Sequence, residues 1–543
     1  MNAAAGTPVA AAAPATGWVT PFGRRTAAAR PTPLDLTRIA TNAAFIIGLL
    51  LLNLGGTVGS GAFFLILLVM ALYGPSSAFK AMAICYLGLL LNQAIVPKTL
   101  VWTPGRLVLP FVVLLRYSID LFGTPRLLFA RGYYLALLLF AATMAACSIA
   151  SGWYTHIALF KLANFTVFTT ATLLLAAILK DRKHDLSEWF VSLIVATTMI
   201  GFIAVATGSS RNFDVHRGVD GLRAEGFFNG AFLHPNVHAL YASMMLMFLA
   251  CLFILAPYRN RWLTLPMVIT WLTFMVYSQS RTSVFAVGIS FLVLVLLAAP
   301  RTLRAGRQLK ANVRRSTLLL VMVASVFAVG VFDLASGRLV SRAVIGFLHK
   351  WDAKDAESLD TEQMLASRQG LIDMGWANFL ENRWTGIGFQ VAKTQAFVDM
   401  ATLFTAPAEK GFLPVAILEE GGILGASAFV IFLLTLLGTW YRERNIPAIV
   451  VMSAFLVSNL GEATMLAPGG GGAFGWIMVG AATILGDNCW TWISKGDASA
   501  RRRSGAKLPP RPLAPVWPDQ RAASMANAAM PRSPAGHPSP GGG

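Results

Sequence analysis

The chain has 543 residues, of which 56% are hydrophobic and 13% are charged, and its formal net charge at pH 7 is +19. A composition this apolar and this poor in charge excludes an ordinary water-soluble globular protein. In a membrane protein, excess basic residues collect on cytoplasmic loops, so the positive charge does not indicate a nucleic-acid partner.

Apolar runs recur along most of the chain, and each is long enough for a helix to cross the ~30 Å hydrocarbon core of a bilayer. Because backbone groups in lipid must be paired internally and the runs lack strand alternation, the sequence predicts an all-α, polytopic helical membrane protein with about 12–14 transmembrane helices. The windows are 39–56, 61–78, 81–97, 107–123, 133–151, 157–179, 188–207, 236–256, 263–279, 283–299, 317–334, 413–437, 446–466 and 473–492.

The distribution of basic residues predicts the orientation and the domain limits. Lys180 to Lys183, Arg259 with Arg261, the run 301–315 and Arg442 with Arg444 all fall on one side of the predicted spans, which the positive-inside rule makes cytoplasmic. The membrane domain is expected at 39–494. The Ala/Pro-rich segment 1–38 and the Pro/Ala/Arg/Gly-rich segment 495–543 are expected to be disordered cytoplasmic tails.

A long segment, 335–412, falls on the outer side and is too long for a simple connection. Its middle, "EQMLASRQGLIDMGWANFLEN", places apolar residues at helical spacing. We therefore expect an amphipathic helix that lies against the membrane in a large periplasmic loop.

Polar residues gather at the predicted outer ends of several spans. Each has an ordinary structural explanation: His-Pro-Asn is a good helix start, and an arginine in a turn can anchor a helix end. Together, arginines and carboxylates on one aqueous face indicate an anionic ligand and acid–base chemistry. The residues are Arg223, His234, Pro235, Asn236, Arg281, Arg368, Glu409, Lys410, Glu419, Glu420 and Glu462.

Four of these stretches, in order, resemble motifs of the bacterial O-antigen ligase and polymerase family, which comprises the Wzy-type polysaccharide polymerases and the WaaL-type ligases. They are the Arg223-x-x-Gly-Phe-Phe stretch that leads to His234-Pro-Asn, the Ser280-Arg-Thr turn, Arg368 and Trp376 followed by Gly386-Ile-Gly388-Phe, and "LEEGGILG" from Leu418 to Gly425. The resemblance covers about 200–440.

The resemblance implies transfer of glycans from an undecaprenyl-diphosphate carrier on the periplasmic face of the bacterial inner membrane. Membrane lipids, and other polysaccharide export proteins, are further expected partners. The developing charge on a diphosphate leaving group needs cationic donors, for which Arg223, Arg281, Arg368 and Lys410 are the candidates. No zinc or nucleotide-sugar motif is present in the sequence, so no metal and no cofactor are expected.

The sequence departs from the family pattern at one place. Many members, ligases especially, carry a His-Asn pair shortly before the "L-x-E-x-G" stretch, and this chain has Glu409-Lys410-Gly-Phe there. The general base is then Glu409, His234 or one of Glu419 and Glu420, although a glutamate in this position can equally cap the helix.

The missing His-Asn pair favours a polymerase that elongates O-antigen or exopolysaccharide over a ligase that passes the polysaccharide to lipid A-core. A lipid-sugar flippase or transporter is a third hypothesis. It is disfavoured because transport sites lie near the bilayer midplane, whereas the polar residues here lie at the predicted outer boundary.

Overall fold

The computed structural model describes residues 34–93, 95–123, 132–179, 183–209, 229–232, 234–255, 261–278, 280–298, 361–393, 410–467 and 469–486. All of them belong to the first of two units, Met1–Trp492, and the second is Ile493–Gly543. Residues 1–33 of the predicted N-terminal tail, the whole predicted tail 495–543, the predicted span 317–334 and the greater part of the long loop 335–412 lie outside the described residues, as do Arg223 and Glu409. The predicted end of the N-terminal tail at residue 38 is wrong, because Asp35 caps a helix that begins at Leu36.

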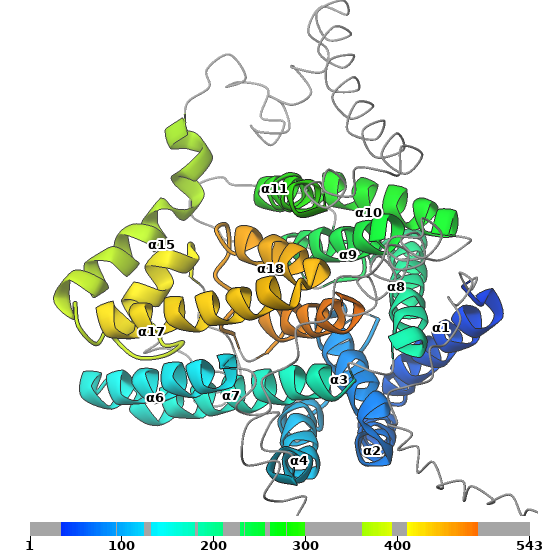
Figure 1. Cartoon of the computed structure of the whole chain (residues 1–543), viewed down its shortest axis with the longest axis horizontal. Helices are drawn as coiled ribbons and strands as arrows, with labels where there is room; N and C mark the ends of the chain where they lie inside the picture. The colour runs from blue at the N-terminus through cyan, green and yellow to red at the C-terminus, as the bar shows by residue number, and fades with distance from the viewer. Residues whose placement is uncertain are drawn as a thin grey trace, which may run out of the picture. The chain divides into compact units, whose positions relative to one another are not determined.

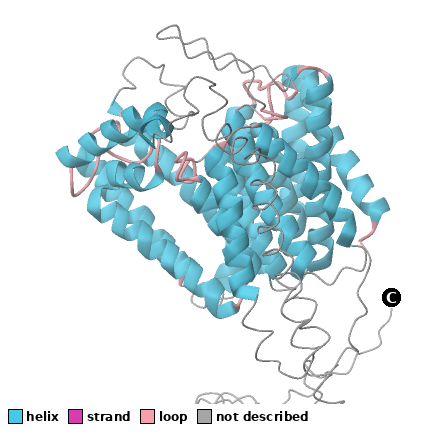
Figure 2. Ribbon diagram, turned by 90° about the horizontal axis from the view of Figure 1, so that it is seen from above, coloured by secondary structure: helices cyan, strands magenta, loops and turns pink. Residues whose placement is uncertain are grey.

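Every regular element among the described residues is a helix (Figures 1 and 2). The elements are α1 (Leu36–Leu51), η1 (Leu52–Gly55), α2 (Gly56–Tyr73), α3 (Pro75–Leu90), α4 (Trp102–Gly123), α6 (Tyr133–Ser151), α7 (Thr155–Ile178), α8 (Lys183–Ala206), α9 (Pro235–Leu255), η4 (Arg261–Thr264), α10 (Leu265–Tyr277), α11 (Arg281–Ala298), α15 (Thr361–Glu381), α17 (Leu413–Glu443) and α18 (Ile446–Ser458). A last apolar helix covers Gly471–Gly486.

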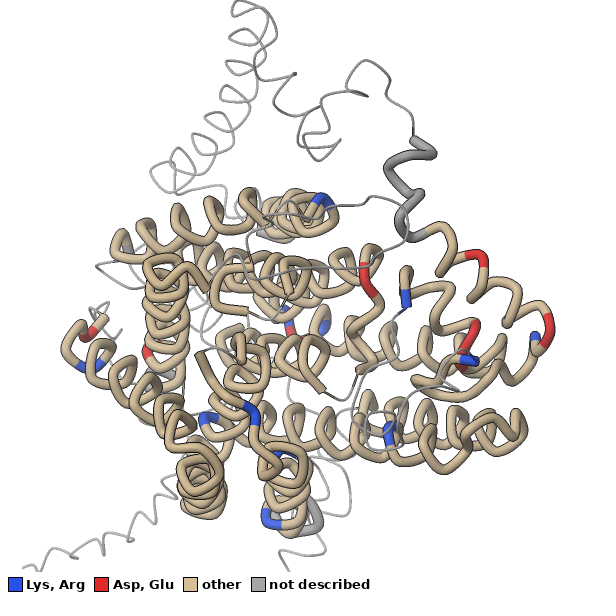
Figure 3. The backbone as a smooth tube through the Cα atoms, turned by 180° about the vertical axis from the view of Figure 1, so that it is seen from behind, with Lys and Arg blue, Asp and Glu red and all other residues tan. Residues whose placement is uncertain are grey.

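Within the described residues, six helical segments are long and apolar enough to cross a membrane: Leu36–Tyr73, Tyr133–Ser151, Thr155–Ile178, Leu186–Ala206, Pro235–Leu255 and Leu413–Glu443. Shorter apolar helices accompany them, and long stretches of helix carry no charged residue (Figure 3). The expected class, an all-α polytopic membrane protein, is confirmed.

Two helices end earlier than their apolar windows predict. The window 81–97 corresponds to α3, which ends at Leu90, and the window 446–466 corresponds to α18, which ends at Ser458. After α18, the Asn459 side chain accepts hydrogen bonds from the backbone N–H groups of Thr464 and Met465, both at 2.7 Å, and turns the chain into a loop. These early ends leave two loops, 91–101 and 459–470.

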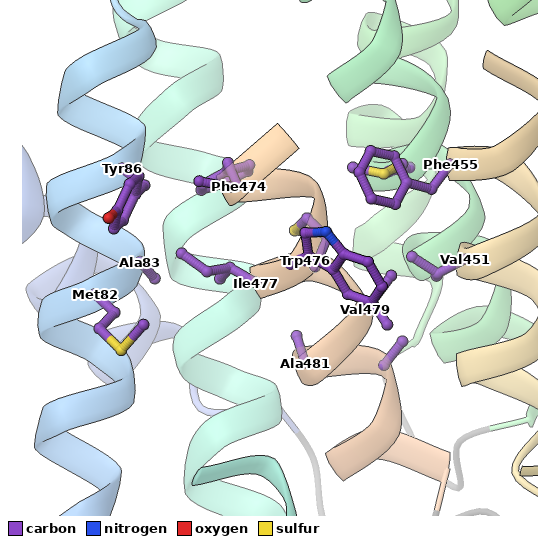
Figure 4. Close-up of a cluster of buried hydrophobic side chains, with 14 of the residues drawn as sticks. Met82, Ala83, Tyr86, Val451, Phe455, Phe474, Trp476, Ile477, Val479 and Ala481 are labelled. Carbon is purple, nitrogen blue, oxygen red and sulfur yellow. The ribbon is translucent and has the colours of Figure 1, made fainter. Parts of the chain in front are cut away.

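The core of the bundle is apolar and aromatic (Figure 4). The helix Gly471–Gly486 packs Trp476 against Phe455 of α18, and their ring centroids are 5.9 Å apart. Tyr86 of α3 lies on the other side of this cluster (Figure 4). Trp476 donates its indole N–H to the Met465 carbonyl at 3.1 Å, so this buried ring leaves no polar atom unpaired.

Candidate functional site

Helix α17 is broken at Gly422, directly after the two adjacent glutamates. Gly422 has φ 58° and ψ −159°, and a Cβ there would overlap the carbonyl group of Trp384. Only glycine has ready access to this conformation, so the second glycine of the Glu-Glu-Gly-Gly motif permits the break. Gly386, also with positive φ (64°), lies equally close to the backbone of Glu419 and Glu420.

The segment 383–388 pairs with the backbone groups that the break exposes. Ile387 and Gly388 donate their N–H groups to the carbonyls of Glu419 and Glu420 at 2.8 and 3.0 Å. In return, Ile423 and Leu424 donate to the carbonyls of Arg383 and Trp384 at 2.8 and 3.3 Å. Irregular backbone in a membrane protein is tolerated where protein supplies the missing hydrogen bonds. The Gly-x-Gly and Glu-Glu-Gly-Gly motifs therefore form one structural unit.

Glu419 is buried and forms an ion pair. Its Oε2 lies 2.6 Å from Nζ of Lys410, and its Oε1 accepts a hydrogen bond from the Asn378 amide at 2.8 Å. Lys410 also donates to the Val391 carbonyl at 3.0 Å. Each oxygen of the Glu419 carboxylate thus has a partner, Lys410 or Asn378 of α15. Through Lys410 the carboxylate is also connected to the segment that contains Val391.

Glu420 is fully buried and has a different environment. Its Oε1 accepts a hydrogen bond from the Gln390 amide at 3.0 Å, whereas its Oε2 has no hydrogen-bond partner among the described residues. Lys161 of α7 holds Gln390 in place by donating to its carbonyl at 2.9 Å. Gln390 itself has φ 53°, a conformation that costs a non-glycine residue about 1 kcal/mol. Glu420 therefore has one oxygen paired with a residue of strained backbone, Gln390, and one oxygen without a partner among the described residues.

The loop after α18 connects these carboxylates to the other sequence motifs. Ala463 donates its N–H to the Lys410 carbonyl at 3.1 Å, and Glu462 accepts a hydrogen bond from the Asn236 side chain at the start of α9. Gly461 packs directly against Thr282 of the Ser-Arg-Thr turn. The His-Pro-Asn, Ser-Arg-Thr, Gly-x-Gly and Glu-Glu-Gly-Gly motifs are thus linked by direct contacts.

The predicted residues fall into three groups. Asn236, Gly386, Gly388, Lys410 and Glu420 are part of the linked set, and Arg281 is the half-buried first residue of α11, one position before Thr282. Arg368 lies in the expected loop helix, α15, but its side chain lies outside the described residues, as do Arg223 and Glu409 entirely. Pro235 is buried at the first position of α9, which is the expected helix-start role.

The predicted base His234 has a structural contact. Its Nδ1 accepts a hydrogen bond from the Asn236 N–H at 3.1 Å, which caps α9. His238, one turn further on, is buried among aromatic rings, and its ring centroid is 5.6 Å from that of Trp271. The cap interaction leaves Nε2 as the N–H-bearing nitrogen of a neutral His234, so a role as base would require the cap to break.

Sequence reasoning missed Lys161, Asn378 and Gln390, which hold the two glutamates, and also Lys98 and Arg106. For Lys98, Arg106 and Lys161, the position in the chain could have marked them as unusual. All fall at predicted outer span ends, where basic residues are depleted. Asn378 and Gln390 carry no comparable signal, because single amides in a loop are common.

Within the described residues, no three His, Cys, Asp or Glu side chains are grouped so that they could hold a metal ion. The expectation of metal-independent transfer stays a prediction. No protein-family model matches the chain, and no curated protein matches it. The resemblance to the O-antigen ligase and polymerase family therefore depends on the motifs, and the candidate site on the contacts between them.

Proposed function

We propose that this protein is a glycan polymerase of a bacterial inner membrane, which transfers oligosaccharide units from an undecaprenyl-diphosphate carrier on the periplasmic face. The supporting observation is the linked set of motifs. Glu462 contacts Asn236, the residue after Glu462 contacts Lys410, and Lys410 contacts Glu419. Residues that would have to act together in such a transfer come from several helices and meet at helix ends that the basic residues assign to one side.

Glu420 is the best-supported general base among the described residues. In the proposed reaction, an acceptor hydroxyl attacks the anomeric carbon of the donor sugar while the bond from that carbon to the diphosphate oxygen breaks. The hydroxyl proton passes to Oε2 of Glu420, which has no hydrogen-bond partner among the described residues. Glu420 is fully buried, so the segment around Gln390, whose amide pairs with the other carboxylate oxygen, must move to admit the acceptor. The positive φ of Gln390 is a backbone strain that such a movement can relieve.

The leaving diphosphate carries the negative charge, and arginine forks are suited to hold it. Arg281 is adjacent to Thr282, which contacts the Glu462 loop, so it is the described arginine best positioned for this role. The diphosphate roles of Arg223, Arg368 and Lys410 stay predictions, as does a base role for Glu409. Lys410 already donates to Glu419 and Val391, which favours a positioning role.

Glycan profiles of a deletion strain test the proposal. A polymerase deletion should leave single repeat units, on carrier lipid or on core, without long chains. A ligase deletion should leave long chains that accumulate on undecaprenyl diphosphate while lipid A-core stays bare. An unchanged glycan profile, with altered uptake or export of a small solute, would instead support the transporter hypothesis.

A further inference from the structure

A second group of cationic side chains lies in the loop between α3 and α4 and at the start of α4. The Lys98 ammonium donates a hydrogen bond to the Gly88 carbonyl and lies 4.5 Å from the centre of the Trp102 ring. Lys98 is half-buried, and none of the ion pairs among the described residues includes it. The hydroxyl of the next residue, Thr99, is buried and has no hydrogen-bond partner among the described residues.

Arg106, in the first turns of α4, is the second cation of this group. Both cations are within electrostatic range of the Cys85 thiol on α3. A Cβ at Gly469 would be 3.0 Å from Nη1 of Arg106, so the glycine-rich stretch 469–472 gives the guanidinium room. The Arg106 carbonyl accepts a hydrogen bond from the Tyr86 hydroxyl at 3.1 Å, which fixes the backbone independently of the side chain.

Two contacts put this group beside the candidate site. Asn92 donates its N–H to the Ala231 carbonyl at 2.8 Å, and Leu91 forms a β-bridge with Phe232. That segment leads directly into His234-Pro-Asn. The loop 459–470 carries Glu462 near one end and Gly469, the neighbour of Arg106, near the other.

Withdrawing an ammonium from water without a nearby anion is costly, and basic residues are depleted on the side where this loop is predicted to lie. A ligand that brings its own negative charge would offset that cost. Burial lowers the pKa of Lys98 to about 7, which is the expected effect when no anion is present.

We propose that Lys98 and Arg106 bind a phosphate group of a lipid-linked substrate, at a position separate from the Ser280-Arg281-Thr282 turn. The identification of the lipid rests on the proposed function, whereas the anion site rests on the contacts of Lys98 and Arg106 alone. The Lys98 ammonium with the buried Thr99 hydroxyl beside it, and the Arg106 guanidinium beside the glycine-rich loop, offer the donors that a phosphate accepts. The Trp102 ring and apolar helices suit a lipid better than a free ion.

The test is binding of undecaprenyl diphosphate, in detergent micelles, to the purified full-length protein. Lys98→Met, which keeps an apolar side chain on Trp102, and Arg106→Gln, which keeps the backbone contact with Tyr86, should each weaken binding about tenfold to hundredfold. Lys98→Arg keeps the charge and should retain most of the affinity. Undecaprenol, which lacks phosphate, should bind weakly to every variant.

Lys80→Met is the matched control, because Lys80 also lies over a tryptophan ring, that of Trp189, at 5.9 Å. It should bind undecaprenyl diphosphate as the unaltered protein does. Wild-type affinity in both Lys98→Met and Arg106→Gln would overturn the proposal. So would inorganic pyrophosphate that binds as tightly as the lipid and displaces it, since the occupant would then be a free anion. The lipid-binding and pyrophosphate measurements do not depend on glycan transfer. Failure of the proposed polymerase function would therefore appear separately, in the glycan profile of the deletion strain.

Discussion

Lys410 Nζ lies 2.6 Å from Glu419 Oε2, and both side chains are buried. Lys410 precedes α17, whereas Glu419 lies in its second turn. Lys410 also contacts the segment that spans the break, through its hydrogen bond to the Val391 carbonyl. The ion pair therefore fastens the start of α17 to the loop that completes the broken helix. Its neighbour Glu420 has no such cation at hydrogen-bond distance among the described residues. Of the two adjacent carboxylates, one is therefore paired with an ammonium and the other with a neutral amide.

Removing one partner of this pair should be more damaging than removing both. Lys410→Met leaves a buried carboxylate without its cation, and we expect a loss of about 3–5 kcal/mol in the free energy of unfolding. Lys410→Met combined with Glu419→Gln should recover most of it, because the neutral amide introduced by the second substitution can still accept from Asn378. Thermal unfolding in detergent measures both. Equal destabilisation by the single and double variants would contradict a net electrostatic role.

Glu420→Gln should abolish transfer without loss of the protein from the membrane. The amide cannot take the acceptor proton, and loss of a general base typically lowers the rate about 10²–10⁴-fold. The Gln390 side chain can still pair with it, so the fold should hold. Polymer length on gels, normalised to protein abundance, reports the effect. Full-length polymer from Glu420→Gln would transfer the base role to Glu409 or His234.

Arg281→Lys keeps the charge but loses the fork that can bind two phosphate oxygens. We expect a severe loss of polymer at unchanged membrane abundance. Arg442→Lys, in the last turn of α17, is the control and should have little effect. Wild-type polymer from Arg281→Lys would make this arginine a structural residue of the turn.

Gly422→Ala should disrupt the helix break. The added Cβ would overlap the Trp384 carbonyl, and the positive φ adds strain, so we expect about 2–5 kcal/mol of destabilisation. Gly438→Ala provides a control in the same helix, where a Cβ meets nothing within 4 Å. It should be neutral or slightly stabilising. Similar unfolding temperatures for the two variants would show that the break tolerates a side chain.

The lowered pKa of Lys98 should make the free energy of unfolding depend on pH. Its pKa is about 7 in the folded protein against an ordinary 10.5, so the unfolded chain binds one more proton between these values. Stability should therefore rise with pH across about 7 to 10.5, and Lys98→Met should flatten that rise. Bound undecaprenyl diphosphate should flatten it too, since an anion beside Lys98 raises its pKa again. Unfolding temperatures measured across this pH range provide the check.

The class of the protein and the positions of its motifs follow from the sequence alone. Apolar runs of bilayer length leave the backbone no alternative to helix, and the all-α membrane class is confirmed. The loop helix predicted within 335–412 is present as α15, and the Glu-Glu-Gly-Gly and Gly-x-Gly stretches could be marked as special because glycines at fixed places permit unusual backbone.

Which polar residues meet is settled by the packing of the helices. Hydropathy does not indicate that α3 ends at Leu90 or α18 at Ser458, because pairing with distant segments and the Asn459 turn override an apolar run. Nor does it distinguish Glu419 from Glu420. These neighbours in the chain project from a helix in different directions, so one meets Lys410 and the other meets Gln390. The partner that each carboxylate acquires depends on contacts between residues far apart in sequence, and such contacts exist only once the helices have packed.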